Sequence, residues 1–174
     1  QAINKLTSFD LSAGQTKEVR DTYLDTEKRA VLAAGYACRR RVLTDETGVT
    51  FTLKGLGNAD GAIHRREEWE IRLPEDEPPQ QWPESPMREK LRQLIDDQPL
   101  MPLFELRQRR TYRPLQRDKH VIAELSLDQV NLAIEGKEQA YFELEVEVKG
   151  AGSEEDLTEM ASWLRETYQL APVS

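Results

Sequence analysis

Alternation of apolar and acidic residues between positions 142 and 148 is the clearest pattern along the chain. Because successive side chains of a strand point to opposite faces, the apolar residues share one face, and Glu143, Glu145 and Glu147 share the other. Carboxylates two residues apart lie roughly 7 Å from each other and repel by about 0.6 kcal/mol in water. The pattern therefore predicts a strand whose acidic face needs solvent, basic partners or a cation.

The same period of two recurs along the chain and predicts further strands. The expected strands span residues 18–25, 36–43, 49–54, 63–73, 103–113, 121–127 and 141–149, with a short additional strand near residue 131. Turn-forming residues at 45–48 and 55–61 separate neighbouring strands by short connections, which favours hairpins. These segments predict an antiparallel meander.

Apolar residues at helical spacing predict helices at residues 2–6, 26–34, 87–97 and 153–170. The segment 74–86 carries five prolines and cannot form regular structure. This segment and the helix after it are expected to form an insertion between strands, at about 84–98. In the last helix, Ser153 followed by Asp156 resembles a capping box. The expected fold class is α+β, with one domain spanning residues 1–174.

The composition of the chain argues against some classes of binding partner. The net charge of -8 and the pI near 5.0 argue against a general nucleic-acid binder, which needs a basic surface. Cys38 is the only cysteine, so an intrachain disulfide is excluded. No apolar run approaches the roughly 18 residues of a membrane span, which predicts no membrane partner and a cytoplasmic location.

Charged and hydroxyl side chains alternate in several of the expected strands, so each set lies on one face. The sets are Arg39 and Arg41; Thr50, Thr52 and Lys54; Arg66, Glu68 and Glu70; Arg107 and Arg109; Glu124, Ser126 and Asp128; and the three glutamates of the acidic strand. For any single strand, a solvated sheet face is a sufficient explanation. Recurrence of paired arginines and paired carboxylates in successive strands favours a polar tunnel inside a sheet closed into a barrel of about eight strands.

The two kinds of charge in such a tunnel suit one class of ligand. Arginine matches phosphate oxygens with its planar fork, and lysine binds them as a point charge. Carboxylates do not bind phosphate directly, but they can hold a hard divalent cation that bridges to it. Acidic and basic residues together therefore favour a metal–polyphosphate ligand.

Several short motifs occur in a fixed order along the chain. They are Tyr23-Leu24-Asp25-Thr26, Arg39-Arg40-Arg41, Thr52-Leu53-Lys54, Arg66-Glu67-Glu68-Trp69-Glu70, Arg107-Gln108-Arg109, Leu125-Ser126-Leu127-Asp128 and Glu143-Leu144-Glu145-Val146-Glu147. Each motif alone is weakly specific. Their ordered combination, over residues 20–150, resembles the CYTH domain family, the triphosphate tunnel metalloenzymes.

The resemblance implies an antiparallel eight-stranded tunnel with flanking helices, and divalent-metal-dependent hydrolysis of inorganic triphosphate or a related phosphoanhydride. It implies phosphate binding by Arg39, Arg41, Lys54, Arg66, Arg107 and Arg109. It implies that Glu143, Glu145, Glu147, Glu70 and Asp128 bind Mg²⁺ or Mn²⁺. Glu68 and Glu145 are the implied catalytic residues, and Glu124 is a further lining residue.

One departure from the family pattern leaves the function open. The family begins with a Glu-x-Glu-x-Lys strand that supplies metal ligands, and no such motif precedes Tyr23. A missing strand would leave an exposed sheet edge and fewer ligands for catalysis. The alternative is a non-catalytic module that binds triphosphate or polyphosphate, joined to a fused or neighbouring domain, and a structural β domain is a third hypothesis. The choice among inorganic triphosphate, organic triphosphates and polyphosphate stays open, as does the oligomeric state.

Overall fold

The computed structural model describes residues 5–6, 9–57, 59–60, 63–64, 66–134 and 137–170. The strands of its main sheet are β1 Lys5–Leu6, β2 Phe9–Leu11, β3 Gln15–Asp25, β4 Tyr36–Leu43, β5 Val49–Gly55, β8 Glu68–Leu73, β9 Met101–Arg117, β10 His120–Ile134 and β11 Lys137–Val148. A separate two-stranded sheet pairs β6 Ala59–Asp60 with β7 Ile63–His64. The helices are α1 Ala30–Ala33, α2 Pro86–Ile95 and α3 Glu154–Tyr168, with a 3₁₀ turn, η1, at Pro79–Gln81.

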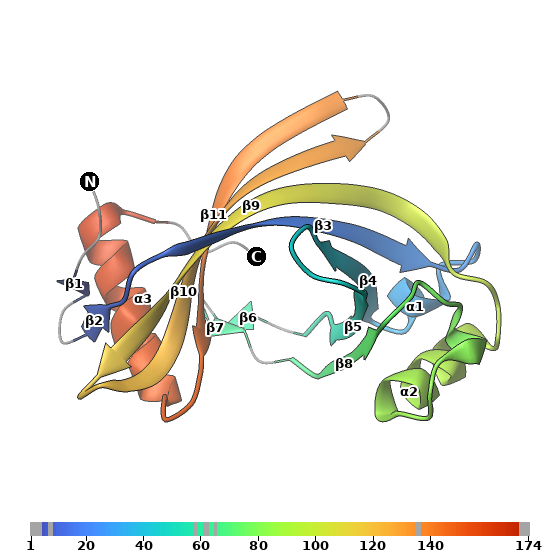
Figure 1. Cartoon of the computed structure of the whole chain (residues 1–174), viewed down its shortest axis with the longest axis horizontal. Coiled ribbons are helices and arrows are strands. Elements are labelled where there is room, and N and C mark those ends of the chain that lie inside the picture. Colours follow the sequence, from blue (N-terminus) through green and yellow to red (C-terminus); the bar gives the residue numbers. More distant parts are fainter. Residues whose placement is uncertain are drawn as a thin grey trace.

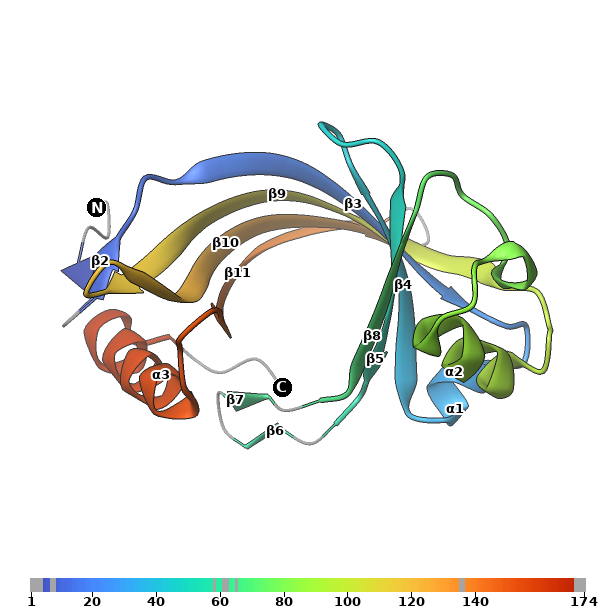
Figure 2. The same ribbon diagram turned by 60° about the horizontal axis from the view of Figure 1, so that its bottom comes forward.

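All ladders of the main sheet are antiparallel, as the short turns predict. The order along the sheet is β1-β2-β9-β3-β4-β5-β8, and β10 joins β9 to β11. The long strands β3, β9, β10 and β11 arch side by side, and β4, β5 and β8 continue from one end of the arch (Figure 2). Among the described strands, β8 and β11 have no hydrogen-bonded partner on their outer edges, so hydrogen bonds do not close the sheet into a barrel.

Helices lie at both ends of the molecule. Figure 1 and Figure 2 show α1 and α2 beside β4, β5 and β8, whereas α3 lies at the opposite end near β2. None of the described helices combines the length and apolar character that crossing a membrane requires. The capping box expected at α3 is confirmed, because Ser153 and Asp156 exchange side-chain to backbone hydrogen bonds.

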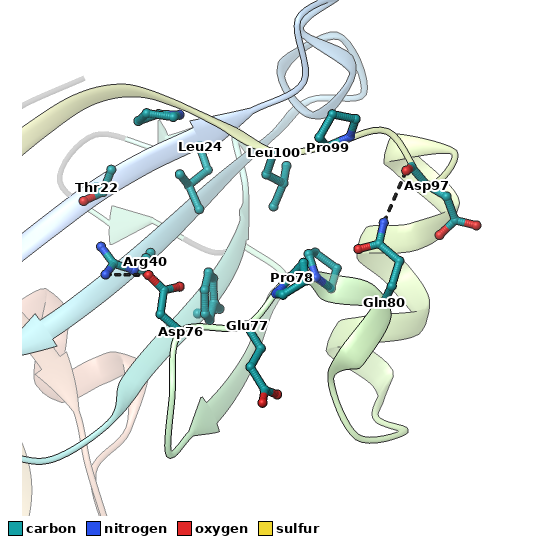
Figure 3. Close-up of a pocket in the computed structure, with 13 residues that line it drawn as sticks. Thr22, Leu24, Arg40, Asp76, Glu77, Pro78, Gln80, Asp97, Pro99 and Leu100 are labelled. Carbon is teal, nitrogen blue, oxygen red and sulfur yellow. Dashed lines mark hydrogen bonds and ion pairs between the residues drawn. The ribbon is translucent and has the colours of Figure 1, made fainter.

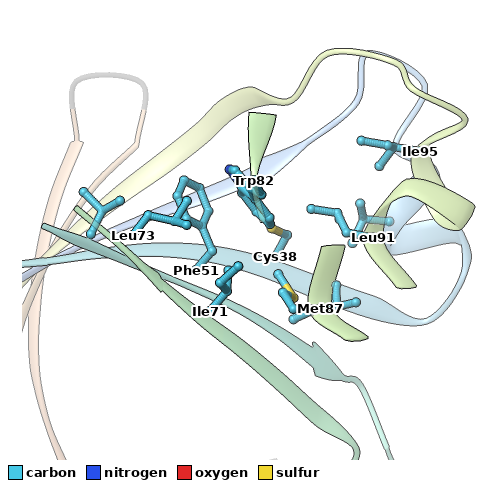
Figure 4. Packing of buried hydrophobic residues seen from close by; sticks show 11 residues of the cluster. Cys38, Phe51, Ile71, Leu73, Trp82, Met87, Leu91 and Ile95 are labelled. Carbon is cyan, nitrogen blue, oxygen red and sulfur yellow. The ribbon is translucent and has the colours of Figure 1, made fainter. Parts of the chain in front are cut away.

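The larger apolar core packs one face of β4, β5 and β8 against α1, η1 and α2 (Figure 4). Its buried residues include Cys38, Phe51 and Leu53 from the strands, and Trp82 and Leu91 from the insertion. Fully burying one such side chain contributes about 1.5–3 kcal/mol. The proline-rich insertion therefore provides one wall of this core.

A second apolar cluster packs α3 against the far end of the sheet. Phe9, Leu115 and Leu125 lie under Met160 and Leu164 of the helix. The face of the sheet that packs against α2 at one end packs against α3 at the other end. Because the helices cover the apolar face of the sheet, the opposite face is left for polar side chains.

Three expectations about local structure are wrong. Lys5 and Leu6 form a strand with β2 rather than a helix, and residues 1–4 lie outside the described ranges. The helix expected at 26–34 contains only the four residues of α1, and Arg29 before it adopts a left-handed conformation. The strand expected at 63–73 is interrupted, so only residues 68–73 join the main sheet.

The short helix α1 depends on one buried carboxylate. Asp25 accepts hydrogen bonds from the backbone N–H groups of Thr26, Val31 and Leu32 at 2.7, 2.9 and 3.0 Å. The amides of Val31 and Leu32 lie at the start of α1, where no carbonyl of the helix is available to them. Asp25 therefore has a structural role, and it belongs to the Tyr23–Thr26 motif identified in the sequence.

Candidate functional site

One face of the main sheet, here called the polar face, carries most of the residues singled out in the sequence. In antiparallel ladders, directly opposite residues project to the same side. The ladder registers therefore place on one face Asp21 and Tyr23 of β3, Arg39 and Arg41 of β4, Thr50, Thr52 and Lys54 of β5, Glu68 and Glu70 of β8, Gln108 and Arg110 of β9, Ser126 and Asp128 of β10, and Glu143 and Glu145 of β11. Basic residues occupy the central strands, and acidic residues dominate β8 and β11.

Asp21 organises the central basic residues. Its carboxylate has no solvent-exposed surface, and it accepts hydrogen bonds from Nε and Nη2 of Arg41, both at 2.7 Å. Arg39 approaches the same carboxylate at 3.6 Å. The arginine side chains are only 14% and 16% exposed, so screening by water is weak. The bidentate contact fixes Arg41 and keeps Arg39 beside it.

A second buried carboxylate holds Arg110. Its Nε lies 2.8 Å from one oxygen of Asp128, and Nη2 donates both to Asp128 and, at 3.3 Å, to Glu145. Asp128 is 2% exposed, and the Arg110 side chain is 15% exposed. Burial opposes the charge of Arg110, but the hydrogen bonds and charges of Asp128 and Glu145 raise its pKa above the ordinary value. Arg110 therefore joins β9 to the acidic strand β11.

Within this group, the surroundings of Glu143 disfavour the charged form of its carboxylate. Burial raises its pKa, and repulsion from Asp128 and Glu145 adds to the rise, while Arg110 lowers it. Asp128 lies directly opposite Glu143 in the ladder between β10 and β11. When carboxylates lie close together and resist ionisation, a bound cation stabilises their charged form.

Electrostatic interactions connect β3 and β11 across the polar face. Burial raises the pKa of Tyr23 on β3, and the charge of Glu143 adds to this rise although β9 and β10 separate the two strands in the sheet. The same carboxylate also raises the pKa of Tyr141, after burial. The charge of Glu143 on β11 thus acts on Tyr23 of β3 across the polar face.

At the other edge of the polar face, acidic and basic residues are also paired. Lys54 lies 3.2 Å from Glu68 across the ladder between β5 and β8. Thr52, which is fully buried, lies 3.4 Å from both Arg39 and Glu70 and connects them. Hydroxyl and carboxylate groups thus extend the site from the central arginines to β8.

The structure separates two of the predicted phosphate ligands from this face, and a third lies outside its ladders. Arg107 and Arg109 project from the opposite face of β9, where their side chains are 69% and 66% exposed and lie near Glu105 and Glu18. Arg66 is exposed in the connection before β8. The expected phase of β9 is therefore wrong by one residue, because its pairing with β3 and β10 turns Gln108 and Arg110 toward the polar face.

The remaining predicted residues share the polar face but not one centre. Arg39 and Arg41 lie together, and Glu143, Glu145 and Asp128 lie together around Arg110. Glu70 and Glu68 lie on β8. Glu147 and Glu124 lie opposite each other further along the β10–β11 ladder, and Glu147 is paired with Lys149 at 2.7 Å.

Sequence reasoning missed Asp21, Gln108 and Arg110. Asp21 precedes Tyr23 by two residues, so the period of a strand places them on one face, and that signal was available. Arg110 had no such signal, because the run from Arg107 to Arg110 places arginine in both phases of the strand. The contact with Asp128 decides the phase, and it belongs to the tertiary structure.

The donor set suits a metal ion that arrives with phosphate. Within the described ranges, no three His, Cys, Asp or Glu side chains converge as a complete metal cage. Glu143 and Glu145 nevertheless offer carboxylate oxygens on one strand, and the raised pKa of Glu143 reflects its burial and then the negative charge around it. Mg²⁺ is commonly bound by one or two carboxylates together with substrate phosphates and water. The residues present therefore fit such a metal.

A cavity of about 450 Å³ lies elsewhere, between β3, β4 and the proline-rich insertion (Figure 3). Arg40 lines it and is paired with Asp76 at 2.6 Å, and Gln80 donates to the carbonyl oxygen of Asp97 at 3.2 Å. Thr22, Leu24 and several prolines complete the wall. Arg40, Asp76 and Asp97 of this cavity are already paired, and the polar face, with its buried arginines and crowded carboxylates, is the stronger candidate site.

Comparisons with known proteins agree with this geometry. Residues 1–172 match the family described as CYTH domain. A solved protein from Hippeastrum, described as a proposed adenylyl cyclase with a dominant triphosphatase activity, is 15% identical, with a TM-score of 0.61 over 97% of this chain and 81% of that one. A proposed adenylate cyclase from Bacillus halodurans is 20% identical, with a TM-score of 0.59 over 91% of this chain and 78% of that one.

The protein PH1819 of Pyrococcus horikoshii OT3 is 18% identical, with a TM-score of 0.54 over 97% of this chain and 82% of that one. The curated proteins include no match. At these identities, the solved structures support the antiparallel tunnel fold. Because the family match extends over nearly the whole sequence, the chain belongs to the CYTH domain family.

Proposed function

We propose that this protein is a divalent-metal-dependent phosphohydrolase that acts on inorganic triphosphate or a related phosphoanhydride. The observation that carries the proposal is the group of three guanidinium side chains on the polar face, from Arg39, Arg41 and Arg110, each less than a fifth exposed. Of these, Arg110 contacts Glu145 on β11, the strand that also carries Glu143. The triphosphatase activity described for the Hippeastrum protein of the same fold supports the reaction class.

The arginines would bind and align the phosphates. A guanidinium group that is fixed by a carboxylate still has N–H groups to donate to phosphate oxygens, and its orientation is set before the ligand arrives. Arg41 and Arg110 are fixed in this way by Asp21 and Asp128. Lys54 adds a charge at the edge of the group. Pre-oriented donors lower the barrier because they need no rearrangement as charge moves onto the leaving phosphate.

A metal would balance the charge of this face. Acidic side chains outnumber basic ones among the polar-face residues defined above, so an accompanying cation would strengthen the binding of an anionic substrate. Glu143 and Glu145 would hold Mg²⁺ or Mn²⁺, with Asp128 beside them. When bound, the metal would neutralise phosphate oxygens and acidify a water molecule. The more distant Glu147 and Glu70 would contribute negative charge rather than direct ligands.

Carboxylates of the polar face would orient the attacking water. Glu145 receives one hydrogen bond, from Arg110 at 3.3 Å, and it stays exposed, so its other oxygen can accept a proton from water. Glu68 on β8 is the second candidate, and it is held by Lys54. Attack in line with the leaving phosphate would require no covalent intermediate.

Replacing Glu145 tests the reaction. We expect Glu145→Gln to reduce Mg²⁺- or Mn²⁺-dependent phosphate release from triphosphate at least 100-fold, on the scale of losing a general base. The matched control is Glu138→Gln, the same change on the opposite face of β11. It should leave the rate unchanged. Equal turnover in the wild type and Glu145→Gln would remove this residue from the mechanism.

The second candidate function is a non-catalytic module that binds triphosphate or polyphosphate. It is favoured by the lack of a complete three-residue metal cage among the described side chains. Calorimetry with triphosphate and with polyphosphate, with and without metal, separates the two functions. Tight binding without phosphate release would establish the binding module and contradict the enzyme.

A further inference from the structure

Gln108 lies on the polar face, and its amide oxygen has no hydrogen-bond partner among the described residues. It is 7% exposed, and its amide oxygen is buried and accepts no hydrogen bond within the described part of the chain. Its ladder neighbours are Val19 of β3 and Val130 of β10, both buried. Valine side chains cannot hydrogen-bond to an amide, so this oxygen is desolvated and unsatisfied in the free protein.

A buried amide that lacks a hydrogen bond destabilises the folded protein. A leucine of similar size would pack between the two valines without leaving a polar atom unpaired. Arg39, on the same face, also has a buried Nε atom that lacks an acceptor. Both side chains belong to the polar face, where the phosphates are proposed to bind, and Arg110 lies two residues from Gln108 on the same side of β9.

We propose that Gln108 is a substrate-binding residue whose amide donates a hydrogen bond to a phosphate oxygen. This inference rests on the proposed function and adds a neutral contact to the three arginines. An amide can rotate so that its NH₂ group faces an anionic oxygen, and the partner decides its orientation. The surrounding valines exclude water, which strengthens a hydrogen bond to a charged acceptor. The rotation places the NH₂ group where the unpaired oxygen lies in the free protein, and the bound phosphoanhydride then supplies its acceptor.

Substitution by leucine separates this role from a structural one. We expect Gln108→Leu to keep or raise the unfolding temperature of the free protein, by about 2–4 °C at most, because it removes an unsatisfied buried group. We expect the same variant to bind inorganic triphosphate about tenfold more weakly in calorimetry with EDTA, where no turnover occurs. Gln108→Asn, which keeps the amide but ends one carbon short, should bind with intermediate affinity.

The matched control is Gln129→Leu, the same change on the exposed opposite face of β10. It should bind triphosphate as the wild type does. If the wild type binds and Gln108→Leu binds equally well, the inference is overturned and the proposed function stands. A clear fall in the unfolding temperature of Gln108→Leu would also overturn it, since the amide would then stabilise the free protein. Lack of triphosphate binding by the wild type would overturn the proposed function and this contact together.

Discussion

Two buried aspartates set the orientation of the arginines on the polar face. Asp21 holds Arg41 through two short hydrogen bonds, and Asp128 holds Arg110 in the same way. Burying a charge is costly unless it is paired, so removing one partner leaves the other uncompensated. A bound phosphate could take the place of the missing carboxylate, because it offers similar acceptor oxygens.

Replacing Asp21 tests this substitution of one anion for another. We expect Asp21→Asn to destabilise the free protein by about 3 kcal/mol, the usual scale for breaking a buried pair. Added triphosphate should then raise its unfolding temperature more than it raises that of the wild type, as differential scanning calorimetry can measure. Glu105→Gln, at an exposed pair with Arg107, should change stability by less than about 1 kcal/mol. An Asp21→Asn protein that triphosphate does not stabilise would contradict the role of these arginines.

At the scale of elements, predictability depended on how strictly the polar residues alternate. The acidic strand was placed correctly because Glu143, Glu145 and Glu147 all fall in one phase. In β9, arginines occupy both phases, and tertiary pairing with Asp128 determines which of them face the site. The length of α1 was overestimated, because helix propensity does not reveal the turn before the helix, where Arg29 adopts a left-handed conformation. Local pattern fixes a strand face only where one phase is chemically uniform.

The capping box of α3 predicts a pH dependence. Burial by itself would raise the pKa of Asp156, but hydrogen bonds from Ser153 and the contact with Arg117 outweigh it and lower the pKa below its ordinary value. The folded state therefore binds this proton less readily than the unfolded state, so the stabilisation is present above pH 4 and is lost as pH falls through the lowered pKa. We expect Asp156→Asn to lower the unfolding temperature at pH 7 and to differ less from the wild type near pH 2. An equal difference at both pH values would contradict the charged cap.

For the whole molecule, the arrangement of cores explains where the site lies. Apolar clusters at both ends hold helices against one face of the sheet, and the other face is left to charged residues. The charge of Glu143 on β11 also acts on Tyr23 of β3 across this face. The fold class and most of this polar face followed from the sequence, whereas the phase of β9 and the partners of each arginine required the three-dimensional structure.

Calorimetric titration of inorganic triphosphate tests the central claim most directly, through two neighbouring arginines on opposite faces of β9. In EDTA, the wild type and Arg109→Ala should bind equally, and Arg110→Ala should lose at least about tenfold in affinity, the scale of a hydrogen bond to a charged group. Arg110→Lys, which keeps the charge, should recover part of the loss. Loss of affinity in Arg109→Ala, with Arg110→Ala unaffected, would contradict the assignment of the polar face as the phosphate site.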